Sequence, residues 1–366
     1  MSASAVRHLY VHLPFCAHRC GYCDFVTVVG RRGEHARYVD ALLAELALER
    51  PLLAEGVETL YLGGGTPTFT EPAALARLLA GLPRAGETTV EANPETVTPG
   101  LAALLREHGV NRVSLGAQSF HTASLDVLER RARPDDVRRA VHLLRGAGID
   151  NISLDLLYGI PGQSASDVAG DIGEALALGP EHLSCYELEA KPGTRFMHAH
   201  GTELESQAEA MEGYFELVVE TLVAAGYRWY ETANFCRDGR EARHNLAYWR
   251  GRDYLGLGIG AVSTVGAVRR RNTPRLAAYV AALAKGERPP REEEQLDADV
   301  RARERLMLGL RLDSPLALAD VRGAVDLDAL ARLEGLGLAE QQADRLLLTR
   351  RGRFLGGGVT AQLLSS

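Results

Sequence analysis

The stretch that decides the fold contains three cysteines within eight residues and reads His12-Leu13-Pro14-Phe15-Cys16-Ala17-His18-Arg19-Cys20-Gly21-Tyr22-Cys23-Asp24-Phe25. Thiolates spaced i, i+4 and i+7 can hold three corners of one [4Fe-4S] cluster, whereas a cluster ligated by protein alone needs four. The remaining iron is then open to chelate the amine and carboxylate of an amino acid. We therefore predict that Cys16, Cys20 and Cys23 hold a [4Fe-4S] cluster whose open iron binds S-adenosylmethionine (SAM), the source of a 5′-deoxyadenosyl radical.

A zinc site is the main alternative for the same cysteines, with His12 or His18 as the fourth ligand. The other two cysteines, Cys185 and Cys236, lie far along the chain, and we interpret them as structural thiols. The spacing of the cysteines favours the cluster over zinc, and the place of the motif, directly after the first predicted strand of a repeated strand–helix pattern, adds to this.

The composition of the chain argues against several classes of protein function. The chain has 366 residues and a net charge of −7, which argues against nucleic-acid binding through bulk electrostatics. No window approaches the roughly 20 apolar residues of a membrane-spanning helix, and the start of the chain lacks a signal-peptide pattern. An odd number of cysteines argues against a disulfide framework. We expect a cytoplasmic protein without a transmembrane segment.

Strands and helices alternate from the start of the chain to about residue 235. Apolar runs predict strands over 9–14, 57–63, 88–92, 112–117, 151–158 and 182–188, and amphipathic patterns predict helices over 35–50, 71–81, 99–108, 121–146 and 164–178. Such alternation is typical of a parallel sheet with outer helices, an α/β fold. Six units instead of eight predict a partial, open (β/α)6 barrel with its function at the C-terminal ends of the strands.

Three domains are expected from the pattern. Residues 1–235 form the barrel, and residues 236–299 form a β-rich extension that ends in a linker over 285–299. Residues 300–366 read as three helices and a hairpin over 337–348, a winged-helix-like module of a smaller α+β region. Its balanced charges argue against a DNA-reading surface. The basic run at 269–271 is interpreted as a solvated strand end, with porphyrin propionates as an alternative partner.

Polar residues follow several predicted strands. Gly63-Gly64-Gly65-Thr66-Pro67 ends the second strand, where glycines let the backbone approach a ligand closely. Glu91 and Gln118 end the third and fourth strands, and Asp155 lies within the fifth. Each could instead serve a turn or a structural hydrogen bond. Together with the cysteines they favour a functional site at one mouth of the barrel.

These motifs resemble the HemN/HemW branch of the radical SAM superfamily over essentially the whole chain. The matching segments are 10–16, 62–67, 91–94, 155–161 and 304–311. The resemblance implies a radical SAM barrel with a smaller C-terminal region. It also implies SAM contacts at Tyr10, Tyr22, Gly64, Gly65, Thr66, Glu91, Gln118, Arg130 and Asp155.

Within this branch, oxygen-independent coproporphyrinogen III oxidases carry a fourth cysteine two residues after the third. Phe25 occupies that position here, which argues against oxidase activity. Heme chaperones of the branch have Cys-Asp-Phe at this point and a His-Asn-x-x-Tyr-Trp motif. This chain has Cys23-Asp24-Phe25, and the resemblance implies heme contacts at His244, Asn245, Tyr248 and Trp249.

The alternative interpretation of the same hexad is purely structural, a packed turn. Many heme chaperones also have a histidine where this chain has Val262, so the heme site here could be different. The resemblance implies a heme chaperone that passes heme to acceptor hemoproteins, with membrane respiratory proteins among the candidate acceptors. The alternative is a true enzyme of the same branch, a C-methyltransferase or a coproporphyrinogen oxidase.

Overall fold

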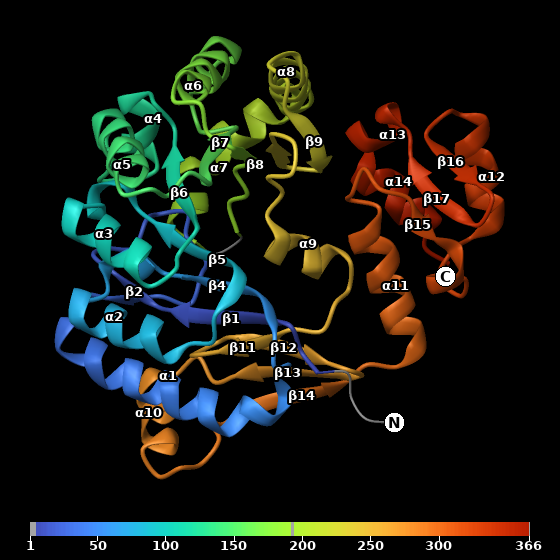
Figure 1. Cartoon of the computed structure of the whole chain (residues 1–366). Coiled ribbons are helices and arrows are strands. Elements are labelled where there is room, and N and C mark those ends of the chain that lie inside the picture. Colours follow the sequence, from blue (N-terminus) through green and yellow to red (C-terminus); the bar gives the residue numbers. More distant parts are fainter. Residues whose placement is uncertain (1–4, 192–193, 366) are drawn as a thin grey trace.

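Six parallel strands with outer helices form the body of the molecule, as Figure 1 shows. The computed structural model describes residues 5–191 and 194–365. The strands are β1 (His8–Leu13), β4 (Val57–Gly64), β5 (Ala85–Ala92), β6 (Arg112–Gln118), β7 (Ile152–Tyr158) and β8 (His182–Glu187). They pair in parallel in chain order, so the predicted partial (β/α)6 barrel is confirmed.

The sheet extends beyond these six strands on both sides. β11 (Leu255–Leu257) pairs in parallel with β1, and β10 (Asn234–Cys236) pairs antiparallel with β8 and with β9 (Arg228–Glu231). The order of the nine strands is β11-β1-β4-β5-β6-β7-β8-β10-β9. Because β11 and β9 lie at opposite ends of this order, the barrel does not close on itself.

The predicted helices are present, with one difference. They are α1 (His35–Glu49), α2 (Pro72–Gly81), α3 (Pro99–Glu107), α5 (Pro134–Gly146) and α6 (Ala165–Ala177). The single helix predicted over 121–146 is wrong: α4 (Thr122–Val127) ends early and α5 starts anew at Pro134, since proline starts a helix well but cannot continue one. The loop between α4 and α5 carries Arg130.

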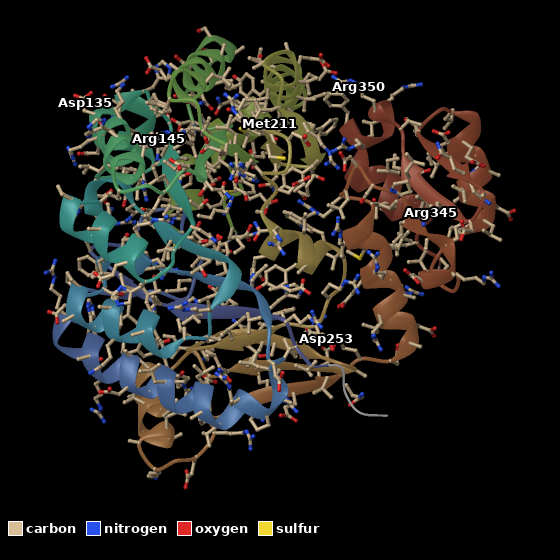
Figure 2. All side chains as sticks on the ribbon, in the orientation of Figure 1. Asp135, Arg145, Met211, Asp253, Arg345 and Arg350 are labelled. Carbon is tan, nitrogen blue, oxygen red and sulfur yellow. The ribbon has the colours of Figure 1, made fainter. Side chains whose placement is uncertain are left out.

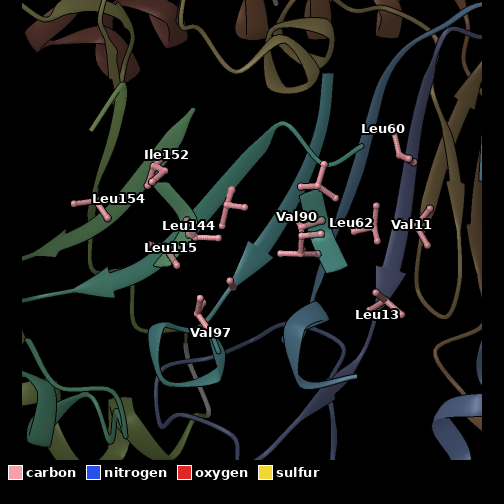
Figure 3. Packing of buried hydrophobic residues seen from close by; sticks show 14 of the residues in the cluster. Val11, Leu13, Leu60, Leu62, Val90, Val97, Leu115, Leu144, Ile152 and Leu154 are labelled. Carbon is pink, nitrogen blue, oxygen red and sulfur yellow. The ribbon is translucent and has the colours of Figure 1, made fainter. Parts of the chain in front are cut away.

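The main hydrophobic core lies between the outer face of the sheet and these helices. Figure 3 shows Val11, Leu62, Val90 and Leu115, from four neighbouring strands, among the packed side chains. Each of these four residues is fully buried. Residues two apart in a strand share a face, so the alternate residues of the same strands must face the barrel interior.

The inner face of the barrel is polar. Its side chains include His8, Tyr10, His12, Thr59, Tyr61, Glu87, Glu91, Arg112, Ser114, Ser153, Asp155, His182 and Ser184, and nearly all are buried or half-buried. Buried polar groups cost free energy unless they find partners. The interior therefore needs a hydrogen-bond network or a polar ligand.

Helix α9 (Arg243–Trp249) closes the N-terminal end of the barrel. The His244 side chain is fully buried, and the Glu87 carboxylate accepts hydrogen bonds from the backbone N–H groups of Arg243 and His244. His244 Nδ1 lies 2.8 Å from Thr59 Oγ1, which lies 2.9 Å from His8 Nδ1. These bonds give Thr59, Glu87 and the His244 ring partners from the protein itself, whereas Nε of the buried Arg112, at the start of β6, has none among the described residues.

A second sheet contains β12 (Val262–Val265), β13 (Val268–Asn272) and β14 (Arg291–Gln295), and α10 (Leu276–Leu283) lies beside it. The expected linker over 285–299 thus contains a strand. β14 is acidic and its side chains face the arginines of β13, with Arg270 Nε 3.1 Å from Glu293 Oε1. The basic run is therefore the central strand of a sheet, paired with acidic side chains.

The C-terminal module lies beside the barrel (Figure 1). It comprises α11 (Ala298–Gly309), β15 (Leu316–Ala317), α12 (Leu327–Gly335), β16 (Ala339–Gln342), β17 (Arg345–Leu348), α13 (Arg350–Phe354) and α14 (Gly356–Leu363). The predicted hairpin is confirmed as β16–β17. The module has its own apolar core, and Figure 2 shows its Arg350 at the edge that faces α8 (Met211–Ala224). In the described part of the chain, no helix is long and apolar enough to cross a membrane.

The buried carboxyl of Glu45 links helix α1 by hydrogen bonds to the extension over residues 236–299. Glu45 accepts hydrogen bonds from the Tyr279 hydroxyl, from Asn272 Nδ2 at 2.6 Å and from the Gly258 N–H at 2.8 Å. Burial raises the pKa of Glu45 to about 7. The folded Glu45 carboxyl keeps its proton to a higher pH than the unfolded one. Its contribution to folding stability is therefore present below about pH 4.5 and is lost as pH rises to about 7.

Two variants test this bond network. We expect Glu45→Ala to lower the free energy of unfolding by about 3 kcal/mol, since it leaves buried donors without an acceptor. Glu45→Gln removes the titration, so its stability should fall less steeply than that of the wild type between pH 4.5 and 7. Urea unfolding across this pH range measures both effects. Parallel pH curves for wild type and Glu45→Gln would contradict the assignment.

Candidate functional site

The cysteine loop follows β1 at the C-terminal mouth of the barrel. Cys16 ends β2 (Phe15–Cys16), which pairs in parallel with β3 (Val28–Val29), so both ends of the loop are fixed. A turn with the Cys23 N–H 3.2 Å from the Cys20 carbonyl shapes the loop. Arg19 adds two hydrogen bonds to the Cys23 carbonyl, at 2.9 and 3.2 Å. The three cysteines line the same cavity.

The glycines at the end of β4 allow the cysteine loop to approach. A Cβ on Gly65 would lie 2.5 Å from the Pro14 carbonyl oxygen and 3.0 Å from Cys16 Sγ. Gly64 has a φ of 113°, which side chains other than glycine rarely adopt, and a Cβ there would lie 2.5 Å from the His12 ring. Both positions therefore require glycine for geometric reasons.

Glu91 lies between these glycines and the barrel interior. Its carboxylate accepts a hydrogen bond from the Tyr61 hydroxyl at 2.7 Å and one from the Gly64 N–H at 3.1 Å. Burial raises the pKa of Glu91 to about 7, and the nearby Asp155 carboxylate adds to the rise. An amine bound beside Glu91 would favour its ionised form.

Arg130 connects the cysteine loop with the ends of two strands. Its Nη2 donates to Asn93 Oδ1 at 3.0 Å and to the Gly116 carbonyl at 2.8 Å, while its Nη1 lies 3.8 Å from Cys20 Sγ. Asn93 in turn donates to Thr66 Oγ1, which lies 3.5 Å from Cys16 Sγ. The positive charge beside Cys20 favours a thiolate there and a negatively charged ligand, whereas burial raises the pKa of the Cys16 thiol.

Asp155 and Gln118 complete the far side of the mouth. Asp155 accepts a hydrogen bond from Ser114 Oγ at 3.1 Å, and burial raises the pKa of its carboxyl. Gln118 has a φ of 65°, at an irregularity where the pairing of β6 with β7 shifts after Gly116. A non-glycine residue in this left-handed conformation is strained, and such strain is common where a side chain is directed at a ligand.

The two histidines considered as a fourth zinc ligand already have hydrogen-bond partners, although His18 Nε2 also lies 3.8 Å from Cys20 Sγ. His12, the alternative fourth ligand, has Nε2 2.8 Å from the Val26 carbonyl and Nδ1 3.0 Å from the Tyr10 hydroxyl, and His18 Nε2 lies 2.8 Å from the Glu129 carbonyl. Within residues 5–191 and 194–365, no three His, Cys, Asp or Glu side chains converge as they would on one ion. Thiolates of a cluster bind different irons and stand further apart.

One cavity of about 1180 Å³ collects most of the predicted residues. Its lining includes the three cysteines and every SAM candidate except Tyr10, namely Tyr22, Gly64, Gly65, Thr66, Glu91, Gln118, Arg130 and Asp155. Tyr10 lies on the inner face of β1 and stacks on Tyr61, with ring centroids 6.1 Å apart. Tyr10 thus supports a lining residue instead of lining the cavity itself.

The predicted heme hexad lies on α9. Only its Asn245 lines the cavity. Both ring nitrogens of His244 lie within hydrogen-bonding distance of other groups, Nδ1 of Thr59 and Nε2 of the Tyr248 hydroxyl at 2.8 Å. Burial lowers the pKa of His244 to about 3, so its imidazole is neutral. Trp249 packs 6.3 Å from Tyr230, ring centroid to ring centroid.

Comparisons with known proteins agree with this geometry. Residues 10–174 match the model of the radical SAM superfamily, and residues 296–355 match the HemN C-terminal domain. The heme chaperone HemW of Mycobacterium tuberculosis is 37% identical over 97% of this chain and 94% of its own length. The HemW of Bacillus subtilis is 32% identical over 98% and 99%, respectively. The chain belongs to the HemW family.

Membership of the HemW family confirms the predicted branch of the radical SAM superfamily. The solved structure of coproporphyrinogen III oxidase HemN from Escherichia coli superimposes with a TM-score of 0.84, covering 99% of this chain and 91% of that one at 24% identity. This likeness concerns the fold alone.

Several cavity residues of this HemW-family chain were not predicted. Asn93 lies within the matching segment 91–94, but the sequence did not indicate that it bonds Arg130. Arg112 starts β6, is buried and lines the cavity, and a charged residue at the start of an otherwise apolar strand could have indicated it. Phe215 and Arg353 line the same cavity from distant parts of the chain, and no local sequence signal brings them together.

Gly65→Ala tests the close approach at the mouth. The added methyl group would meet the Pro14 carbonyl and Cys16 Sγ, so we expect cluster iron and sulfide after anaerobic reconstitution to fall to less than half of the wild-type level. Gly100→Ala is the matched control, because a Cβ there meets nothing within 4 Å, and alanine favours helix α3. A Gly65→Ala protein with a full cluster that still responds spectroscopically to SAM would refute this account.

Proposed function

We propose that this HemW-family protein carries heme to acceptor hemoproteins on a scaffold that also binds a [4Fe-4S] cluster and SAM. The observation that carries the proposal is the near full-length relation to heme chaperones, combined with one cavity that the cysteine loop and Asn245 of the hexad both line. We also propose that the protein works in the cytoplasm and that its acceptors include membrane respiratory proteins.

In the proposed site, Cys16, Cys20 and Cys23 hold three irons of the cluster. When bound there, the cluster supplies an electron and SAM supplies the radical precursor. The protein residues position the ligand. Gly64 and Gly65 offer backbone groups to the methionine part of SAM, and the remaining proposed contacts are Tyr22, Thr66, Glu91, Gln118, Arg130 and Asp155. Tyr10 is proposed to act through Tyr61, on which it stacks.

The residues of the hexad over 244–249 are proposed to serve two purposes, contact with heme and attachment of α9 to the barrel. Asn245 reaches the cavity as it stands and is the proposed heme contact. Contact by His244 requires α9 to move, because His244 is fully buried with both ring nitrogens engaged. Tyr248 and Trp249 are half-buried beside it and are proposed as further heme contacts, although neither lines the cavity. As the protein stands, His244 holds α9 against the floor of the barrel.

Heme binding and transfer test the function directly. After anaerobic reconstitution, we expect the wild type to shift the heme Soret band, to keep heme through gel filtration and to pass it to an apo-hemoprotein. Cys20→Ala should lose the cluster and its response to SAM, since a cubane with two protein ligands is poorly held. Cys236→Ala is the control, because Cys236 is buried in β10 away from the cavity lining.

Two outcomes would contradict the proposal. One is a reconstituted wild type that binds no heme. The other is steady turnover of SAM that yields a methylated or decarboxylated product, which would favour an enzyme of the branch over a carrier.

Two neighbouring residues of the hexad are expected to differ in what they affect, His244 the folding stability and Asn245 the affinity for heme. His244→Ala should lower the free energy of unfolding by about 2 to 4 kcal/mol, because it removes a buried ring and leaves the Tyr248 hydroxyl without its partner, while Thr59 keeps only its bond to His8. Asn245→Ala should leave stability almost unchanged and weaken heme binding, because the structure shows no hydrogen bond from its side chain to another described residue. Urea unfolding and heme titration measure the two effects. An unchanged heme affinity in Asn245→Ala would contradict the assigned contact.

A further inference from the structure

The cavity continues well beyond the proposed SAM site. Its volume of about 1180 Å³ exceeds the roughly 300–1,000 Å³ of most small-molecule sites. Away from the cysteine loop, helices α8 and α11 and the segment around α13 form its wall, where it is lined by Met211, Phe215, Met307, Leu310, Arg353, Phe354 and Leu355. Figure 2 shows Met211 near the middle of the molecule, at the start of α8. None of these residues takes part in the proposed SAM site.

This wall is apolar and aromatic. The rings of Phe215, Trp229 and Phe354 form one cluster, with centroids 5.2 to 5.8 Å apart, across the boundary between the barrel and the C-terminal module. At the rim, Met307 and Leu355 are 49% and 45% exposed. Large apolar side chains that line a cavity and remain exposed are suited to cover a flat apolar ligand.

One arginine of this wall, Arg353, has a guanidinium nitrogen without a hydrogen-bond partner among the described residues. The Arg353 guanidinium lies over Trp229, with Cζ 3.7 Å from the ring centroid, and its Nη2 is buried without a hydrogen-bond partner in the described part of the chain. The neighbouring Arg311 differs, because its Nε donates to Glu231 at 2.6 Å. Burial lowers the pKa of Arg353 to about 10, which still leaves it charged at neutral pH. A partly buried guanidinium without a partner favours an anionic ligand.

We propose that this part of the cavity binds the porphyrin of the heme cargo, with the macrocycle against the Phe215–Phe354 wall and one propionate on Arg353. The inference rests on the proposed function and adds the place and polarity of the cargo site. It follows from two requirements that meet here, a flat apolar surface and, beside it, a guanidinium whose Nη2 has no hydrogen-bond partner among the described residues. Porphyrin faces match the first and a propionate carboxylate matches the second.

Arg353→Met tests the propionate contact, with Arg350→Met as the matched control. Arg350 lies on the same helix but outside the cavity lining, and it donates to the exposed Glu220 on α8. Heme and its dimethyl ester, which lacks free carboxylates, are titrated against each protein by Soret absorbance. Cluster content and the melting temperature verify that each variant is folded.

We expect the wild type to bind heme at least tenfold more tightly than the dimethyl ester. Arg353→Met should weaken heme binding about tenfold and abolish this preference, while Arg350→Met keeps both. The melting temperature of Arg353→Met should change little, because the lost stacking on Trp229 is offset by removal of a buried Nη2 without a hydrogen-bond partner.

The outcomes separate the two proposals. A wild type that binds neither porphyrin overturns the proposed function and this inference with it. A wild type that binds heme, alongside an Arg353→Met protein with the same affinity and the same preference, overturns this inference alone. An equal loss in both arginine variants also overturns it, because general surface charge would then explain the effect.

Discussion

The alternation of side chains along six parallel strands is the constraint on which the structure depends. Outward residues such as Leu62 and Leu115 form the apolar core beneath the helices, so the intervening residues must face the barrel interior. That interior is polar, and each buried polar group needs a partner. At the floor the protein supplies the partners itself, through Thr59 and His244. At the mouth the groups converge on a cavity, where a polar ligand can complete them.

The proposed cofactor site and the proposed cargo site follow from this difference between the two ends. Arg130 draws the cysteine loop toward the ends of β5 and β6, and glycine at position 65 lets that loop approach β4. The open side of the barrel, which a full eight-unit barrel would close with two further units, is instead covered by α9 and the C-terminal module. A partial barrel therefore leaves room for a second ligand beside the first.

Sequence predicted the parts whose signal is local. The six strands, the cysteine motif and the glycine turn each carry their pattern within a few residues, and the structure places them together. The acidic strand β14 was predicted as a linker because the segment is rich in proline and glutamate, and its pairing with the arginines of β13, some twenty residues earlier, leaves no local signal. The contact between Phe215 and Phe354 could not be predicted, since it joins two helices that pack only in the folded chain.

The position of the C-terminal module is fixed by charge pairs, and this bears on how well the proposed cargo site is formed before binding. Arg228 donates to both carboxylate oxygens of Asp313, at 2.7 and 2.9 Å, and the buried Glu231 accepts from Arg311. The backbone adds to this, because the Asp313 N–H donates to the carbonyl of Tyr230 in β9. A wall held by a bidentate pair and a buried carboxylate loses little conformational entropy when a ligand arrives, which favours binding. Arg353 is the exception, since Trp229 holds its guanidinium in place while its Nη2 has no hydrogen-bond partner among the described residues.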